Sequence, residues 1–336
     1  MSRSESSTEN SMSQFINFFK DINKNSVDIA GGKGASLGEM TQAGIPVPPG
    51  FVLIADAFDR FVEETQIKIE IEARLKEVNP EDMNSVEKAS TVLQDVIHDT
   101  SMPEDLTNEI LISFDSLNAE YVAVRSSATA EDSDVASWAG ELDTFLNTTR
   151  DRVVENVKKC WASLFTPRAI FYRHEKGLID AHVSVAVVVQ QMVQSEISGI
   201  AFTVHPVTED HDQMIIEAGF GLGEAIVSGQ VTPDSYVVSK SEGTIIDINV
   251  GHQSRKIERL PSDLRSKEDF KISELNHWVE LGEEGNKQKL TGRQIIELAE
   301  LCKKIEAHYG FPCDIEWAFC DGTFFITQSR PITTLK

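Results

Sequence analysis

The sequence has no long hydrophobic run, no concentrated basic surface and no cysteine spacing of the zinc-site type, and each absence excludes a class of protein. No apolar stretch reaches the roughly 20 residues that span a bilayer, so no membrane association is expected. A formal net charge of −23 over 336 residues argues against a binder of nucleic acid, which needs clustered cations. A polyanion bound here must be small and held by a few fixed cations, with a metal beside them.

The cysteines and the first residues are equally uninformative about chemistry. The four cysteines form no CxxC pair and show no zinc-type spacing to histidine, so reduced and mostly buried thiols in a cytoplasmic protein are expected. Residues 1–13 are rich in serine and lack the apolar segment of a signal peptide, which predicts a disordered tail. The overall composition is that of a soluble globular protein, and its length allows one large domain or two lobes that share a cleft.

Helix-type and strand-type segments indicate an α+β fold. A helical run from Lys33 to Ala43 is followed by Gly44, at a position that favours a left-handed cap. Residues 56–117 have helical spacing with breaks near Pro80 and Pro103, which predicts three helices. Strand composition dominates after residue 183, interrupted by a Glu- and Lys-rich segment over 254–289 that is expected to be a solvated insertion. The expected lobes are residues 14–180 and residues 181–336.

A glycine-rich turn precedes the first of these helices. The segment Gly31-Gly32-Lys33-Gly34 places flexible backbone and one cation near a helix N-terminus, where unpaired N–H groups and the helix dipole favour phosphate. The spacing of a Walker A motif is absent. Taken alone, a glycine pair before a helix is more typical of a plain turn than of a phosphate site.

Two further loops are compatible with nucleotide contact. Arg125 ends a short β-type run, and its planar guanidinium can bind two phosphate oxygens at once. The same guanidinium could instead form an ordinary interdomain salt bridge. The loop after it ends in the small residues of Ala136–Thr144, which suit a lid over a triphosphate or a plain surface loop. The segment GFGLGE over 219–224 resembles a dinucleotide fingerprint, but position 224 is Glu where that motif needs glycine.

The last two strands carry metal-type and phosphate-type ligands. Asp314 and Glu316 share one strand face by the period of two, as do Gln328 and Arg330. Carboxylate and amide oxygens beside a guanidinium suit a magnesium nucleotide.

The turn between these strands decides whether Glu316 and Gln328 can share a metal. A two-residue hairpin at Asp321-Gly322 would oppose Glu316 to Thr327 and leave Gln328 on the other face. A shared metal therefore requires a connection with an odd number of residues, such as a three-residue loop with a bulge.

Four strings in one order carry a family resemblance, namely GGKGASLGEM, VRSSATAEDSDVASWAGELDTFLN, GLGEAIVSGQVTPDSYVV and DIEWAF with ITQSRPIT. From about Gly31 to Thr334 the sequence resembles the N-terminal nucleotide-binding domain of phosphoenolpyruvate synthase, pyruvate phosphate dikinase and rifampicin phosphotransferase. This resemblance implies an ATP-grasp-like pair of lobes that hold ATP and Mg²⁺ in the cleft between them.

The resemblance also implies roles for individual residues. Lys33 and Arg125 would hold phosphates, Glu316 and Gln328 would coordinate Mg²⁺, and Arg330 would contact the transferring phosphoryl group. The segment Gln190-Gln191-Met192-Val193 aligns with the hinge that receives adenine, and Glu217 and Gly140 are further members of the nucleotide site.

The activity implied by the resemblance is that of a kinase or phosphotransferase, of which this chain would supply the ATP-using half. The acceptor would be a histidine on a separate swivelling domain or chain, which passes the phosphoryl group to pyruvate on a further domain, giving phosphoenolpyruvate, AMP and phosphate. His205 lies in a turn before Pro206, which favours a structural role over that of the phosphohistidine. A nucleotide-binding module without transfer activity and the nucleotide subunit of a rifampicin phosphotransferase stay open as alternatives.

Overall fold

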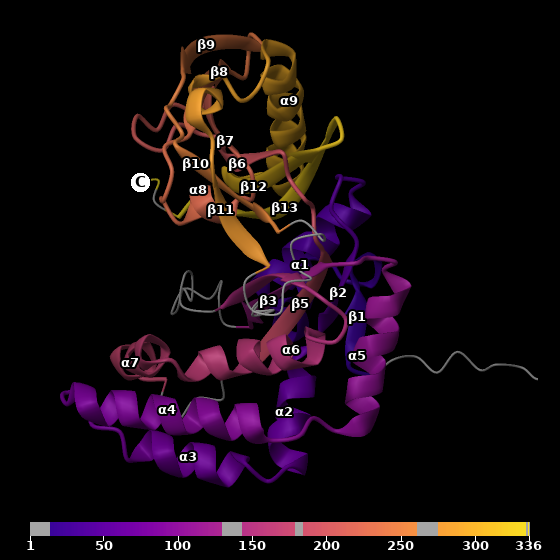
Figure 1. Ribbon diagram of the computed structural model, residues 1–336, viewed down its shortest axis with the longest axis vertical. Helices are drawn as coiled ribbons and strands as arrows, with labels where there is room; N and C mark the ends of the chain where they lie inside the picture. The colour runs from indigo at the N-terminus through magenta and orange to yellow at the C-terminus, as the bar shows by residue number, and fades with distance from the viewer. Residues whose placement is uncertain (1–13, 130–142, 179–183, 261–274, 334, 336) are drawn as a thin grey trace, which may run out of the picture.

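The computed structural model describes residues 14–129, 143–178, 184–260, 275–333 and 335. Two lobes stand one above the other in Figure 1, and helix α1 (Val27–Gln42) lies where they meet. Among the described residues, no helix is long and apolar enough to cross a bilayer. The two lobes are mixtures of helix and strand, which confirms the α+β class.

The first lobe is a five-stranded sheet backed by helices. The strand order is β1-β2-β5-β3-β4, all antiparallel. The strands are β1 (Ile16–Phe18), β2 (Gly50–Leu53), β3 (Val122–Ala128), β4 (Thr144–Thr148) and β5 (Val185–Gln191). The helices of this lobe are α2 (Ala55–Glu64), α3 (Lys68–Lys76), α4 (Met83–Asp99), α5 (Glu104–Ser116), α6 (Val153–Ala162) and α7 (Pro167–Glu175), with short 3₁₀ turns at Phe19–Asp21, Lys24–Ser26 and Ser163–Phe165.

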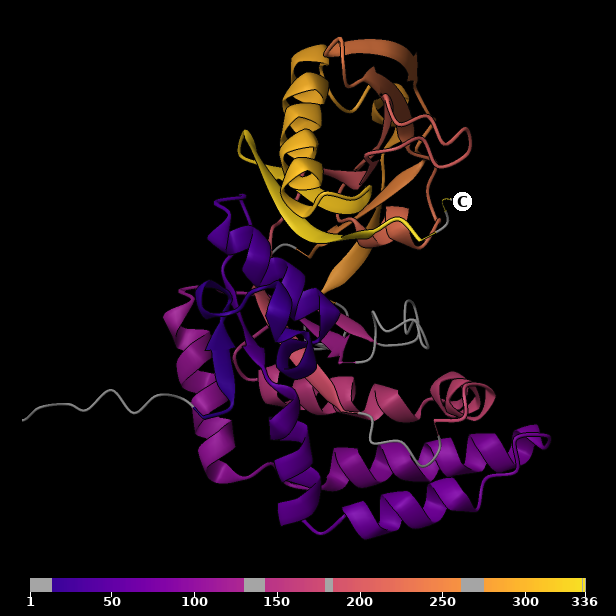
Figure 2. The same ribbon diagram turned by 180° about the vertical axis from the view of Figure 1, so that it is seen from behind.

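The second lobe is a six-stranded sheet covered by one long helix, α9 (Gly292–Tyr309), as Figure 2 shows from behind. The strand order is β13-β12-β6-β7-β8-β9. The strands are β6 (Ile197–Phe202), β7 (Gln213–Phe220), β8 (Asp234–Ser239), β9 (Thr244–Asn249), β12 (Cys313–Cys320) and β13 (Thr323–Pro331). A separate hairpin, β10 (Arg255–Arg259) with β11 (Asn276–Glu280), accompanies the short α8 (Glu224–Val227) and a 3₁₀ turn at Gly282–Asn286.

Two of the sequence predictions need correction here. Four helices occupy residues 55–116 in place of three, because the chain turns at Gln66, whose φ is +62°. The expected solvated insertion over 254–289 contains the β10–β11 hairpin, which reaches the first lobe: Arg259 lies 4.5 Å over the ring of Tyr121, and Asn147 Nδ2 donates to Asn276 Oδ1 at 2.6 Å. The high content of charged residues did not make this segment a solvated insertion, because long charged side chains can bury their stems against neighbouring rings.

The strands also shift the expected lobe boundary. Strand β5 follows residue 180 but pairs with β2 and β3, so the first sheet continues to Gln191 and the second begins at Ile197.

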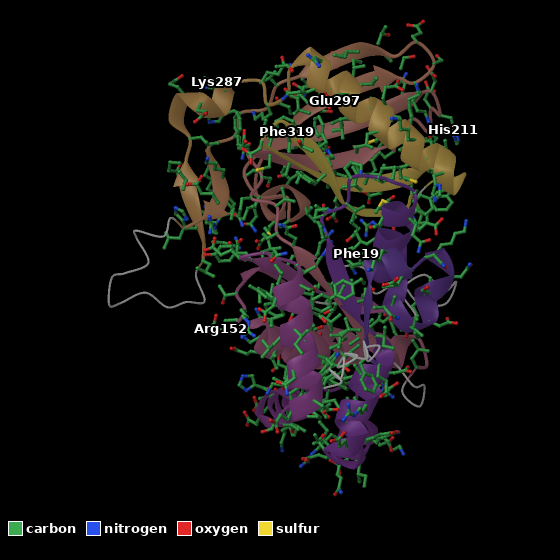
Figure 3. All side chains as sticks on the ribbon, turned by 90° about the vertical axis from the view of Figure 1, so that its right-hand side faces the viewer. Phe19, Arg152, His211, Lys287, Glu297 and Phe319 are labelled. Atoms are coloured by element: carbon green, nitrogen blue, oxygen red, sulfur yellow. The ribbon has the colours of Figure 1, made fainter. Side chains whose placement is uncertain are left out.

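Helix α1 joins the cores of the two lobes. One face of the first sheet packs on α2 to α7 around Trp161, while its other face, through Val52 and Val188, belongs to a cluster shared with the second lobe. Leu37 and Met40 of α1 lie in that shared cluster, beside side chains of β6 to β8, α9 and β12. In Figure 3, Phe19 marks the same junction. Because the two lobes share one apolar core, α1 cannot move with only one of them.

The break at the start of α1 has a steric cause. Gly31 has φ +67° inside the helix, and a Cβ there would stand 2.4 Å from the carbonyl oxygen of Ser127 on β3. Only glycine allows this close approach and this backbone conformation. The regular helix therefore starts beside Lys33 and ends before Gly44, whose φ of +72° confirms the predicted left-handed position.

A buried ion pair organises the second lobe. Lys289 Nζ lies 2.8 Å from Asp234 Oδ1, and both side chains are completely buried. Asp234 also accepts from the backbone N–H groups of Gly251 and Lys289 and from the Tyr236 hydroxyl. Lys289 donates a further bond to the carbonyl oxygen of Gly251. The pair thus ties the start of β8 to the segment that leads into α9.

We expect Lys289→Met to destabilise the protein by about 3 kcal/mol or more, because it leaves the Asp234 carboxylate buried without its cation. Lys303→Ala, which removes a partly exposed pair with Glu300, is the matched control and should cost less than about 1 kcal/mol. Urea unfolding of the two variants measures the difference. Equal losses would contradict the assigned role of the buried pair.

Candidate functional site

A β-bulge in the last hairpin brings Glu316 and Gln328 together. The turn has two residues, Asp321 and Gly322, so the prediction of an odd-numbered connection is wrong. The extra residue lies within β13 instead: Trp317 pairs with Ile326 and Glu316 pairs with Gln328, which leaves Thr327 unpaired. Glu316 and Gln328 therefore lie on one face, as a shared metal requires.

Arg125 of the first lobe reaches this pair directly. Its Nη2 donates to Gln328 Oε1 and lies 3.6 Å from Glu316 Oε2, while its Nη1 donates to the carbonyl oxygen of Thr327 at 2.8 Å. The arginine side chain is only 10% exposed. Three oxygens from the second lobe thus converge on one cationic group, across the boundary between the lobes.

Arg330 and Glu217 extend the same face of the second sheet. Arg330 pairs with Asp314 across the strands, and its Nη2 lies 2.8 Å from Asp314 Oδ2. Glu217 of β7 faces the same way, because it pairs with Ile200, which pairs with Glu316. The alternating residues Ile315 and Trp317 point to the opposite face and are buried in the core under α9. The sheet thus separates an apolar face from an ionic one.

The ionic face carries Glu217, Asp314 and Glu316, and the pKa of Glu217 is shifted by its burial and by a neighbouring charge. Burial, followed by the charge of Asp314, raises the pKa of Glu217 above its ordinary value. The two arginines offset part of this negative charge, since each pairs with one of the other two carboxylates. Such a face favours additional positive charge.

The glycine-rich turn is fixed to the strand that carries Arg125. Ser127 Oγ accepts from the Gly34 N–H at 3.2 Å and donates to the carbonyl oxygen of Ala30 at 2.9 Å. Ser127 shares a face of β3 with Arg125 by the period of two. Lys33, which is partly buried, follows this anchored turn.

The hinge residues lie farther along the same sheet. Gln190 and Gln191 pair with Ala123 and Val122, which lie about 7 and about 10 Å along β3 from Arg125 at roughly 3.3 Å per residue. The Gln191 and Met192 N–H groups donate to the carbonyl oxygens of Pro49 and Tyr121, so these two donors are engaged within the first lobe.

The side chains of the hinge differ in their surroundings. The Gln190 amide is buried and donates to Pro48, whereas Met192 packs on Leu222 and Ile257 of the second lobe. Val193 is partly buried, and Gly140 lies outside the described residues.

A cavity of about 300 Å³ lies beside this site, against β4 and the start of α6. Its lining includes Thr144, which pairs with Arg125, together with Arg152 and Lys159 of the first lobe and Glu224 and Asn276 of the second. The cavity is therefore bounded by the two lobes and continues from the strand position next to Arg125.

Comparison with known proteins decides the family. The model of the pyruvate phosphate dikinase, AMP/ATP-binding domain family matches residues 27–336. The chain belongs to this family. The resemblance inferred from the four sequence strings is thereby confirmed, and this AMP/ATP-binding domain is the unit that binds the nucleotide.

Several relatives of the AMP/ATP-binding domain are similar over nearly all of this chain. A probable phosphoenolpyruvate synthase of Methanothermobacter thermautotrophicus is 44% identical over 96% of the chain and 47% of its own length. The phosphoenolpyruvate synthase of Pyrococcus furiosus is 41% identical over 96% of the chain and 44% of its own length. The rifampicin phosphotransferase of Bacillus subtilis is 37% identical over 96% of the chain and 36% of its own length. The chain therefore spans less than half the length of these relatives.

Among solved structures, D-alanyl-alanine synthetase A of Vibrio cholerae covers 89% of the chain and 57% of its own, with a TM-score of 0.33 and 8% identity.

Sequence reasoning missed two contributors to the site. The carbonyl oxygen of Thr327 carries no side-chain signal, and Ser127 acts through contacts with a distant turn. Asp314 was placed on the correct face by the period of two, yet its pairing with Arg330 depends on the bulge.

We expect Glu217→Gln to stabilise the protein at pH 7 to 8. Because the pKa of Glu217 is raised in the folded state, the folded protein holds this proton more tightly than the unfolded chain. Ionised Glu217 therefore lowers stability above the ordinary glutamate pKa, and the gain in the variant should vanish below about pH 4. Urea unfolding between pH 4 and 8 tests this, with Glu297→Gln on the exposed face of α9 as control (Figure 3). A gain that does not change with pH would refute the electrostatic explanation.

Proposed function

We propose that this chain binds Mg²⁺-ATP between its lobes and transfers a phosphoryl group to a histidine on a separate domain or chain, which ultimately phosphorylates pyruvate. The products of the complete reaction are phosphoenolpyruvate, AMP and phosphate. The observation that carries the proposal is the contact of Arg125 with Glu316 and Gln328 in a member of the AMP/ATP-binding domain family.

The residues present fit a magnesium ion. Glu316 and Gln328 offer a carboxylate and an amide oxygen, the ligand types that Mg²⁺ prefers, and their oxygens already converge on one cationic group. When bound with ATP, the ion would neutralise charge on the phosphate oxygens. The proposal assigns Glu316 and Gln328 to hold it.

The cationic residues of the chain would act on the triphosphate. Lys33 and Arg125 would hold phosphates from the first lobe, and Arg330 would contact the transferring group from the second. Phosphoryl transfer depends mainly on positioning and on stabilising charge spread over the phosphate oxygens. The side chain of Arg330 is 49% exposed, which leaves it accessible to a reacting group.

The hinge would receive the base. The segment Gln190 to Val193 begins about 7 Å along the sheet from Arg125 and reaches about 10 Å at Gln191, a separation compatible with the base and phosphates of one nucleotide. Met192, packed on Leu222, would offer an apolar contact, and Glu217 and Gly140 would complete the site.

The test of transfer supplies ATP, Mg²⁺ and the histidine domain of a phosphoenolpyruvate synthase relative, and measures AMP and phosphohistidine. Wild type should form AMP and phosphohistidine. Lys33→Ala and Arg330→Ala should lower the rate about 100-fold or more, because each removes a charge that stabilises the transition state. Lys33→Ala should also weaken ATP binding.

Lys303→Ala on α9 is the control and should transfer at the wild-type rate. Transfer at that rate in either site variant would refute the role assigned to the substituted residue. Intact ATP binding without AMP or phosphohistidine would instead favour a nucleotide-binding module without transfer activity.

The similarity to rifampicin phosphotransferase favours a second candidate function, in which the same nucleotide chemistry phosphorylates an antibiotic. Rifampicin and pyruvate supplied in parallel, each with the partner domains of the matching relative, distinguish the two acceptors. Phosphorylated rifampicin without phosphoenolpyruvate would favour the second candidate.

A further inference from the structure

One hydroxyl group connects the two halves of the proposed site. Ser36 Oγ on α1 donates to the backbone carbonyl oxygen of Ser329 on β13 at 2.7 Å. Ser36 lies three residues after Lys33, about 4.5 Å along the helix axis at 1.5 Å per residue. Ser329 lies between Gln328 and Arg330 in the sequence. The bond therefore joins the helix that carries Lys33 to the backbone that carries the metal-type and phosphate-type ligands.

Helix α9 supports this bond from the second lobe. The Tyr309 hydroxyl lies 3.2 Å from Ser36 Oγ and donates to the Ser36 carbonyl oxygen at 3.2 Å. Burial raises the pKa of Tyr309 to about 12, so the hydroxyl keeps its proton at neutral pH. One turn along α1, Glu39 Oε1 lies 2.8 Å from His308 Nε2.

Directional contacts are needed here because the shared core does not fix register by itself. Apolar burial is non-directional and tolerates small shifts of one surface over another, whereas a hydrogen bond fails outside a narrow range of distance and angle. The bond from Ser36 to Ser329 is therefore suited to set the offset between α1 and β13. An error of 1 Å in such an offset is sufficient to disturb a reacting geometry.

We propose that Ser36 is a positioning residue that couples Mg²⁺ binding to ATP binding by fixing Lys33 relative to Glu316, Gln328 and Arg330. This inference rests on the proposed function. Mg²⁺ held by the second lobe and phosphates held by the first strengthen each other's binding only when the two lobes keep their register. The coupling is measured as the ratio of the ATP dissociation constant without Mg²⁺ to that with Mg²⁺.

The experiment measures this ratio by isothermal titration calorimetry for the whole chain. Ser36→Ala should reduce the ratio about fivefold, the value expected for loss of one partly buried hydrogen bond. Ser36→Thr keeps the hydroxyl and should restore the ratio toward that of wild type.

Thr41→Ala is the matched control. Thr41 is a hydroxyl residue on the same helix, and it donates to the carbonyl oxygen of Leu37 within that helix at 2.7 Å. The control should keep the wild-type ratio. Thermal unfolding of each variant separates a change in coupling from a change in stability.

Tyr309→Phe provides a second variant that decides the matter if Ser36→Ala does not fold. It keeps the ring, which stacks on Phe311, and removes the hydroxyl that bonds to Ser36, so it should also lower the ratio. An unchanged ratio in the folded variants would overturn the proposal, as would an equal fall in Thr41→Ala.

Two further outcomes separate this inference from the function on which it rests. If Ser36→Ala weakens ATP binding by the same factor with and without Mg²⁺, the coupling is unchanged and Ser36 has a purely structural role, which overturns the proposal. A wild-type ratio of one would contradict the magnesium assignment, and the positioning proposal would fall with it.

Discussion

The structure depends on the burial of α1 between two sheets. Its apolar residues belong to the core of the second lobe, while its first turn is pressed against β3 of the first lobe through Gly31 and Ser127. Separating the two sheets would expose this core, and sliding one sheet over the other would leave buried polar groups without partners. The lobes are therefore held in register by the element that carries Lys33, and the site forms on the surfaces that this helix brings together.

A second constraint is electrostatic. The chain carries a net charge of −23, yet its site sets two arginines against an acidic sheet face, so that each guanidinium is held by oxygens from the second lobe. Arg125 has little exposure to water, and its contacts keep a positive charge at the boundary of the lobes. A strongly acidic protein can bind a polyanion in this way, because local fixed charges outweigh the distant net charge at short range.

Sequence periodicity placed the ionic face correctly but could not show how it is assembled. Alternation along β12 and β13 identified Asp314, Glu316, Gln328 and Arg330. The bulge at Thr327 was located wrongly, since a bulge within a strand has no glycine or proline signal here. Contacts such as Asn147 with Asn276 join residues more than a hundred positions apart, and no local pattern encodes them. The roles proposed for the nucleotide-binding residues depend on the family strings more than on spacing.

The bulge separates the tip of the last hairpin from its functional part. Residues from Trp317 to Cys320 keep one register with Phe324 to Ile326, and the register that pairs Glu316 with Gln328 begins only beyond Thr327. The alignment of Glu316 with Gln328 is thus specified locally, next to Arg125, and not by the length of the turn at Asp321-Gly322. The turn is accordingly a place where the chain can accept inserted residues or a spectroscopic label without displacing these two side chains.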